Sequence, residues 1–209
     1  MMDVEAEAMY SDLWQTGSFE CSDPIVTKVY QNALWGQRDN FLNVPTDCPQ
    51  RDERLGWTGD AQVFCKSAMY NMDCRLFFEK YLGDIRDAQL GNGVIPAVAP
   101  LPPVGSFAYT GYDASAGWSE AIGEITYQYY KMYGDMRIVR DNLPALKSTL
   151  LEDSSKIPFA VSVSITMYRF SRAIFVTSFH FFLFVFSNKY MIAYLKKIVN
   201  PFFRYILIR

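Results

Sequence analysis

Apolar side chains recur at helical spacing through most of the first 152 residues, and this pattern restricts the fold more than any other feature. Between residues 74 and 90, for example, Leu76, Phe77, Tyr81, Leu82 and Ile85 fall on one face of a helix. The sequence has neither the strand–helix alternation nor the phosphate-loop lysine motif that would indicate a parallel nucleotide-binding sheet. The sequence therefore predicts an all-α fold. Five helices are expected, over residues 24–41, 59–72, 74–90, 118–133 and 135–152.

Glycine and proline mark the connections between these helices. Residues 94–117 contain four prolines and are expected to be a long loop, whereas Gly134 ends one helix directly before the next. Pro144 interrupts the last helical pattern and predicts a break there. The opening YSDLWQTGSF, from Tyr10, is predicted to contain a short strand.

Composition changes abruptly after Glu152. Residues 1–152 carry 12 basic and 21 acidic side chains, while residues 153–209 carry eight basic side chains and one acid. All 12 glycines precede this point, and ten of the 16 phenylalanines follow it. The net charge of −2 argues against a nucleic-acid partner. The uncharged run 173–187 is shorter than the roughly 20 residues that span a bilayer, but membrane contact through it is left open.

The cysteines do not form a metal-binding pattern. Cys21, Cys48, Cys65 and Cys74 include no CxxC pair, and the single histidine, His180, lies far along the chain. We therefore expect reduced, partly buried thiols and neither a metal nor a cofactor. The first residues contain no secretory signal, which favours a cytoplasmic location.

One segment, PTDCPQRDERLGWTGDAQVF from Pro45 to Phe64, concentrates carboxylates, guanidiniums and an indole in a glycine-bent loop. A carboxyl group beside an indole face is desolvated and holds its proton, whereas one beside arginine stays ionised. Neighbouring carboxyls in such different environments can supply both an acid and an ionised partner. This combination is typical of carbohydrate chemistry. Solvated ion pairs, a helix-capping Asp60 and a core-anchoring Trp57 are the structural alternative.

The motifs from about Ser18 to Asp135 resemble the start of the catalytic domain of bacterial-type α-L-rhamnosidases. The matching pieces are TGSFECSDP, ALWGQRDNFLNVPTDCPQRDERLGWTGDAQVF, YNMD, FFEKYLGDIRDAQ, the VIPAVAP loop, SAGWSEA and YGD. The resemblance implies an (α/α)6 toroid of six helical hairpins and an inverting glycosidase that cleaves terminal α-L-rhamnosides. A rhamnose-containing glycoside is the implied partner.

The resemblance also implies roles for individual residues. Glu53 would be the general acid that protonates the leaving oxygen, with Asp47 and Asp60 binding rhamnose hydroxyls. Arg51 would hold the cluster, and Trp57 and Trp118 would wall the pocket; for Trp118, a core anchor at a helix start is the alternative. Glu120 stands where the family usually has aspartate, which shifts the carboxylate by about one methylene.

An inverting glycosidase also needs a second carboxylate as general base. In the family this base comes from later hairpins, and the resemblance ends near Glu152. We therefore expect an incomplete toroid at residues 18–152, a remnant of a preceding β-domain at 1–17 and an unrelated tail at 153–209, with an inactive isolated chain. The alternatives are a non-catalytic carbohydrate-binding protein or a membrane-associated remnant.

Overall fold

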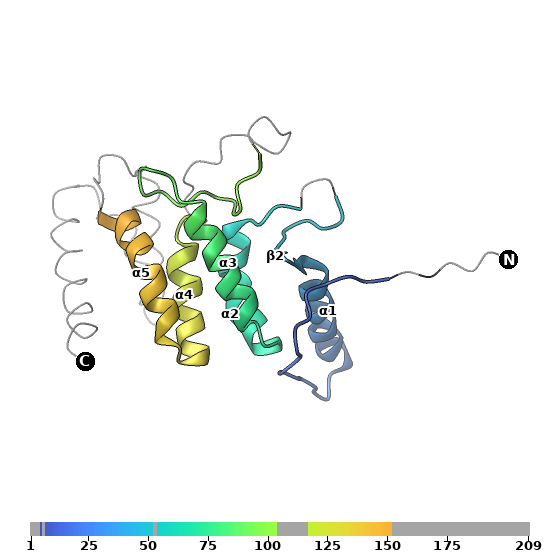
Figure 1. The fold of residues 1–209 in the computed structure, drawn as a ribbon. Helices are drawn as coiled ribbons and strands as arrows, with labels where there is room; N and C mark the ends of the chain where they lie inside the picture. The colour runs from blue at the N-terminus through green and yellow to red at the C-terminus, as the bar shows by residue number, and fades with distance from the viewer. Residues whose placement is uncertain (1–4, 6, 52–53, 104–116, 152–209) are drawn as a thin grey trace, which may run out of the picture. The chain divides into compact units, whose positions relative to one another are not determined.

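The computed structural model describes residues 5, 7–51, 54–103 and 117–151, and the regular structure in these ranges is mainly helical (Figure 1). Two short strands, β1 (Phe41–Leu42) and β2 (Val44–Pro45), form an antiparallel hairpin after the first helix. The five helices confirm the sequence prediction, with ends that differ by a few residues. They are α1 (Pro24–Asn40), α2 (Thr58–Asn71), α3 (Arg75–Asp87), α4 (Ala121–Tyr133) and α5 (Met136–Leu151).

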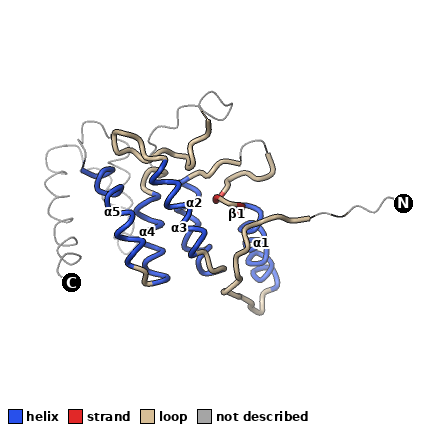
Figure 2. The backbone as a smooth tube through the Cα atoms, in the orientation of Figure 1, coloured by secondary structure: helices blue, strands red, loops and turns tan. Residues whose placement is uncertain are grey.

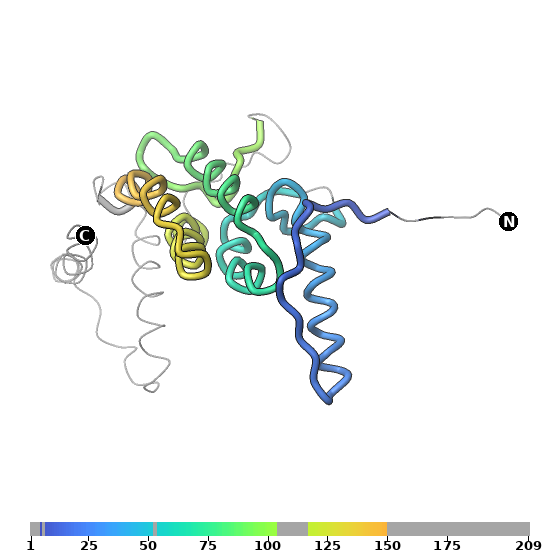
Figure 3. Tube along the Cα trace, turned by 60° about the horizontal axis from the view of Figure 1, so that its bottom comes forward, coloured from blue at the N-terminus to red at the C-terminus, as the bar shows by residue number. Residues whose placement is uncertain are grey.

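The predicted N-terminal strand is wrong in its extent. This segment runs as a loop before α1 (Figure 2). Among the described residues, residues 10–19 form only an isolated bridge, between Gln15 and Met72. Hydrogen bonds nevertheless fix this segment: the Ser11 amide donates to Phe41 O, and the Thr16 amide donates to Asn71 O. The segment runs beside α1 (Figure 3). Its hydrogen bonds connect the C-terminal end of α1 with the C-terminal end of α2.

The core lies among α2, α3, α4 and α5, with α4 packed against the other three. On α3 and α4 the fully enclosed large side chains are aromatic and branched: Phe78, Tyr81, Leu82, Ile85, Ile122, Ile125 and Tyr129. These residues recur at helical spacing, so α3 and α4 each bury one face. The predicted break at Pro144 does not occur, since α5 continues through this residue, which lies on its exposed side.

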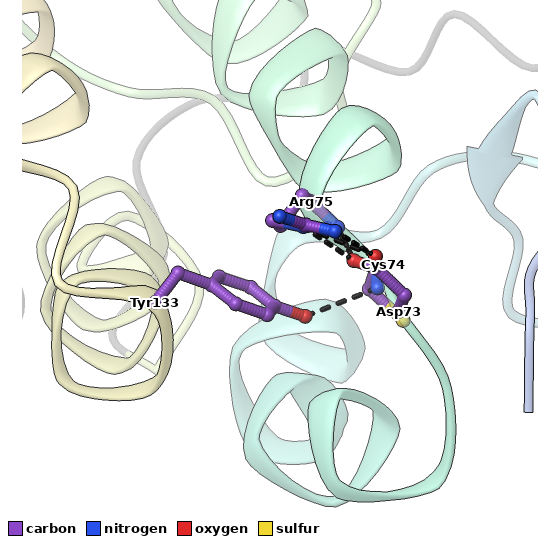
Figure 4. A network of polar contacts seen from close by, with 4 residues as sticks. All are labelled: Asp73, Cys74, Arg75 and Tyr133. Carbon is purple, nitrogen blue, oxygen red and sulfur yellow. Dashed lines mark hydrogen bonds and ion pairs between the residues drawn. The ribbon is translucent and has the colours of Figure 1, made fainter. Parts of the chain in front are cut away.

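A polar network closes the turn between α2 and α3 (Figure 4). The Arg75 guanidinium pairs with the Asp73 carboxylate. The hydrogen bond from Arg75 is the main reason why the pKa of Asp73 lies below its ordinary value. The Cys74 amide donates to the Tyr133 hydroxyl at 3.0 Å, which joins this turn to the end of α4. Burial raises the pKa of the Cys74 thiol to about 12. Asp135 and Arg137 repeat the same pairing at the α4–α5 turn.

Helix α1 is attached to this core through Gln37, which is buried. Its side-chain amide donates to Ala68 O at 3.3 Å, and Asn71 Nδ2 donates to its oxygen at 2.9 Å. Leu34 is also buried, but Ile25, Val26 and Val29 near the start of α1 are exposed. The C-terminal half of α1 is therefore the part that docks, and it forms one side of the pocket described next.

Candidate active site

A pocket of about 570 Å³ lies between the C-terminal part of α1 and the N-terminal part of α2, next to the β1–β2 hairpin. This volume is in the range of small-molecule sites. It brings together three of the residues that the sequence predicted for the site: Asp47, Asp60 and Trp118. They come from a loop, a helix and a segment more than fifty residues further along. The rest of the lining comprises Ala33, Gly36, Gln37, Asn40, Phe41, Pro45, Thr46, Gly59, Ala61, Val63, Phe64 and Gly117.

The backbone holds Asp47 from both sides. The amide and hydroxyl of Thr46 each donate to Asn40 O at 2.8 Å, which anchors the loop to the end of α1. The Asp47 amide donates to Leu55 O at 3.2 Å across the loop. The Asp47 carboxylate accepts a hydrogen bond from the Cys48 thiol at 3.0 Å. Asp47 is thus placed by loop closure, which sequence spacing alone does not reveal.

The start of α2 is bonded against residues 97–99, and this pairing places Asp60. Thr58 donates from both its amide and its hydroxyl to Ala97 O, and the Ala99 amide donates to Gly56 O at 2.9 Å. A side chain at Gly56 would meet Ala99 O at 2.2 Å, so this approach requires glycine. Asp60 then lies exposed in the first turn of α2, where the helix dipole favours a negative charge.

Trp118 packs its indole directly over Gly59. A β-carbon added to Gly59 would lie 2.6 Å from Trp118 Nε1 and 2.7 Å from two further ring atoms. The Nε1–H group of Trp118 is buried and has no hydrogen-bond partner within the described ranges. The indole therefore lines the pocket, and its Nε1–H group lies buried against Gly59.

Two other predicted residues lie outside the lining. Trp57 is partly buried at the N-cap of α2, where it forms a bridge with Val98, and Arg51 is exposed on the turn that follows Pro49. Of the residues that the structure describes, the pocket lining includes neither of them. Glu53 and its neighbour Asp52 fall outside the described residues, and so does the run 173–187.

Glu120, at the departure from the family pattern, caps the turn before α4. Its Oε2 accepts a hydrogen bond from the Gly117 amide at 2.9 Å. Gly117 O in turn accepts from Gln62 Nε2 on α2, so the residue before Trp118 is bonded through both its amide and its carbonyl. In this chain Glu120 therefore acts on the backbone beside Trp118.

Taken together, the pocket lining combines two carboxylate acceptors with an indole. Ionised carboxylates accept hydrogen bonds only, so they suit a ligand with several hydroxyl groups. No three His, Cys, Asp or Glu side chains in the described ranges are grouped so that they could hold a metal ion. Within the same ranges no helix has the length and hydropathy needed to cross a membrane.

The described helices, with a pocket lined by two carboxylates and an indole, define an all-α domain of paired helices. The model of the bacterial α-L-rhamnosidase six-hairpin glycosidase domain matches residues 14–159. The chain belongs to this family, and its five described helices correspond to part of the six-hairpin domain.

Several rhamnosidases resemble the chain in sequence. The α-L-rhamnosidase of Streptomyces avermitilis is 42% identical over 147 residues, which are 70% of this chain and 14% of that protein. An α-L-rhamnosidase of Alteromonas sp. is 35% identical over 163 residues, 78% of this chain and 17% of the relative. The chain thus spans about one sixth or less of the length of these relatives.

Solved structures resemble it to a similar degree. The S. avermitilis α-L-rhamnosidase complexed with L-rhamnose matches with a TM-score of 0.63 at 40% identity, covering 68% of this chain and 13% of that one. The α-L-rhamnosidase from Dictyoglumus thermophilum gives a TM-score of 0.62 at 38% identity, covering 67% and 15%.

Proposed function

We propose that this chain contributes the general acid and part of the sugar-binding surface of an inverting α-L-rhamnosidase. The observation that carries the proposal is the convergence of Asp47, Asp60 and Trp118 on one pocket. In this proposal the two carboxylates accept hydrogen bonds from rhamnose hydroxyls, and the Trp118 indole covers an apolar face of the ring. The relative crystallised with L-rhamnose supports rhamnose as the sugar.

Glu53 is proposed as the acid that protonates the leaving glycosidic oxygen, with Trp57 as the proposed source of its desolvation and Arg51 as the proposed partner that keeps another carboxylate ionised. A protonated carboxyl at neutral pH requires desolvation, and a nearby indole provides it. Inversion requires a second carboxylate that activates water on the opposite face of the sugar. The proposal assigns no residue of this chain to that role, and hydrolysis is proposed only for the rhamnosidase as a whole.

Sugar binding is tested by calorimetric titration of the 209-residue chain with L-rhamnose. We expect saturable binding, weakened about tenfold or more by Asp60→Asn, because the variant loses a charged acceptor whose hydrogen bonds are worth about 1.5–3 kcal/mol. Asp87→Asn is the matched control: Asp87 is an exposed carboxylate at the end of α3, outside the pocket lining. No heat of binding up to tens of millimolar sugar, or equal losses in both variants, would contradict the proposal.

The acid role requires a different measurement, because it concerns turnover. Residues 14–159 would replace the matching segment of the S. avermitilis enzyme, and hydrolysis of an aryl α-L-rhamnoside would be followed. We expect the exchanged protein to hydrolyse the substrate and Glu53→Gln to abolish most of this activity. Full turnover by the variant would remove Glu53 from the role.

A further inference from the structure

Cys48 donates its thiol hydrogen to the carboxylate that lines the pocket. The distance from Cys48 Sγ to Asp47 Oδ2 is 3.0 Å, and Cys48 is partly buried. Within the described part of the chain, the Cys48 thiol is the side chain that donates to the Asp47 carboxylate. The sequence marked Cys48 only as one of four reduced thiols, so its place beside the pocket was not foreseen.

The backbone around this pair is fixed by contacts that do not involve the thiol. Thr46 is anchored to the end of α1, and the Asp47 amide is bonded across the loop to Leu55 O. On the other side, Arg54 Nε donates to Pro49 O at 3.2 Å. Cys48 also precedes a proline, which restricts its own backbone to extended conformations. The thiol therefore has a defined position relative to Asp47.

This contact has a consequence for ligand binding. An ionised carboxylate has two oxygens that together accept about four hydrogen bonds. One thiol donor on Oδ2 limits rotation of the carboxylate and still leaves acceptor capacity for hydroxyl groups of a ligand. A thiol is a weak donor, so it orients the carboxylate without competing strongly for its charge. A carboxylate fixed in this way loses less rotational freedom when a sugar binds.

We propose that Cys48 is a positioning residue for Asp47 in rhamnose recognition. The role rests on the proposed function, since it assumes that Asp47 binds a sugar hydroxyl. In this role the Cys48 thiol orients the Asp47 carboxylate and does not itself contact the sugar. The donor, rather than the sulfur, is the feature that matters.

Substitutions that keep or remove the donor test the proposal in L-rhamnose titrations of the 209-residue chain. Cys48→Ala removes the donor, and we expect the dissociation constant to rise about five- to tenfold. Cys48→Ser keeps a donor at a similar position, so its dissociation constant should stay within about threefold of the unsubstituted chain. Cys21→Ala, at an exposed thiol outside the pocket lining, should change nothing. Equal affinity for the alanine variant and the unsubstituted chain would overturn the proposal, as would a serine variant as weak as alanine.

A second measurement reads the contact without sugar. Iodoacetamide alkylates a cysteine when sulfur bonds to its carbon, iodide leaves and the thiol proton passes to solvent. We expect Asp47→Asn to speed alkylation of Cys48 at least threefold relative to Cys21, because the ionised carboxylate holds the proton and opposes the thiolate. An unchanged ratio would overturn the contact itself. A chain that binds no L-rhamnose but shows the altered ratio would refute the proposed function and the positioning role, while the contact would stand.

Discussion

Substituting Gly59 by alanine should displace the Trp118 indole and weaken the pocket. The added β-carbon would lie 2.6 Å from Trp118 Nε1 and 2.7 Å from Cδ1 and Cε2. Carbon atoms in van der Waals contact prefer about 3.5–4.0 Å, so the ring must move by about 1 Å. Overpacking of this kind costs about 1–3 kcal/mol. Alanine gains up to about 1 kcal/mol over glycine in a helix, so the net loss is between zero and about 3 kcal/mol.

Gly83→Ala provides the matched control for this substitution. Gly83 lies within α3, and its added β-carbon would meet only the end of the Arg86 side chain at 3.6 Å, an ordinary contact. This variant should gain up to about 1 kcal/mol of stability, because it has the helix-propensity benefit without the clash.

Three measurements on both variants test the argument. Urea unfolding gives the free energies, the Trp118 indole NMR signal reports the ring position, and L-rhamnose titration reports the pocket. We expect Gly59→Ala to be less stable than Gly83→Ala, to shift the indole signal and to bind sugar more weakly. A Gly59→Ala protein as stable as Gly83→Ala, with an unmoved indole signal, would refute the packing argument.

Three further predictions concern how the helices are held. Gln37→Leu should lower the free energy of unfolding in urea by about 1–3 kcal/mol, because it leaves Asn71 Nδ2 without its buried acceptor. Gln31→Leu, on the exposed side of α1, should change this free energy little, and equal effects of the two variants would contradict the docking role of Gln37. Burial raises the pKa of Cys74 from 9.0 to about 12, so the stability that this thiol contributes is complete below pH 9 and is lost as the pH rises toward 12. Between pH 9 and 10, Cys74→Ala should therefore lose less unfolding free energy than the unsubstituted chain, and identical pH profiles would argue against the buried thiol. Pro144→Ala should raise the unfolding free energy by about 1–3 kcal/mol, since it restores a helical hydrogen bond at an exposed site, and a loss of stability would show that the proline is needed there.

The helices could be predicted because their signals are local. Pro24 after the capping Asp23, the apolar spacing around Phe77 and Tyr81, and Gly134 in a left-handed conformation each act within a few residues. The β1–β2 hairpin was missed because it depends on Asn43, a non-glycine residue with a φ of 68°. Pro144 was misread as a break, since a proline on the exposed side of a packed helix removes one hydrogen bond without removing the packing.

The pocket was only partly predictable. Asp47 and Asp60 are close in sequence, and the loop motif identified them, whereas the position of Trp118 over Gly59 depends on tertiary packing between α2 and the segment before α4. The linings contributed by Ala33, Gly36 and Asn40 were not foreseen, because nothing in the sequence says which face of α1 meets α2. For Cys48, adjacency to Asp47 was a usable signal, but the direction of its thiol required the folded loop.

An NMR titration of the isotope-labelled 209-residue chain with L-rhamnose tests the central claim most directly. We expect saturable shifts of the Trp118 indole signal and of the Asp47, Gly59 and Asp60 amides. The Asp73 and Arg75 amides, at the far end of α2, should serve as unshifted references. Absence of any shift at tens of millimolar sugar, or shifts of equal size at both ends of α2, would contradict the assignment of this pocket to rhamnose.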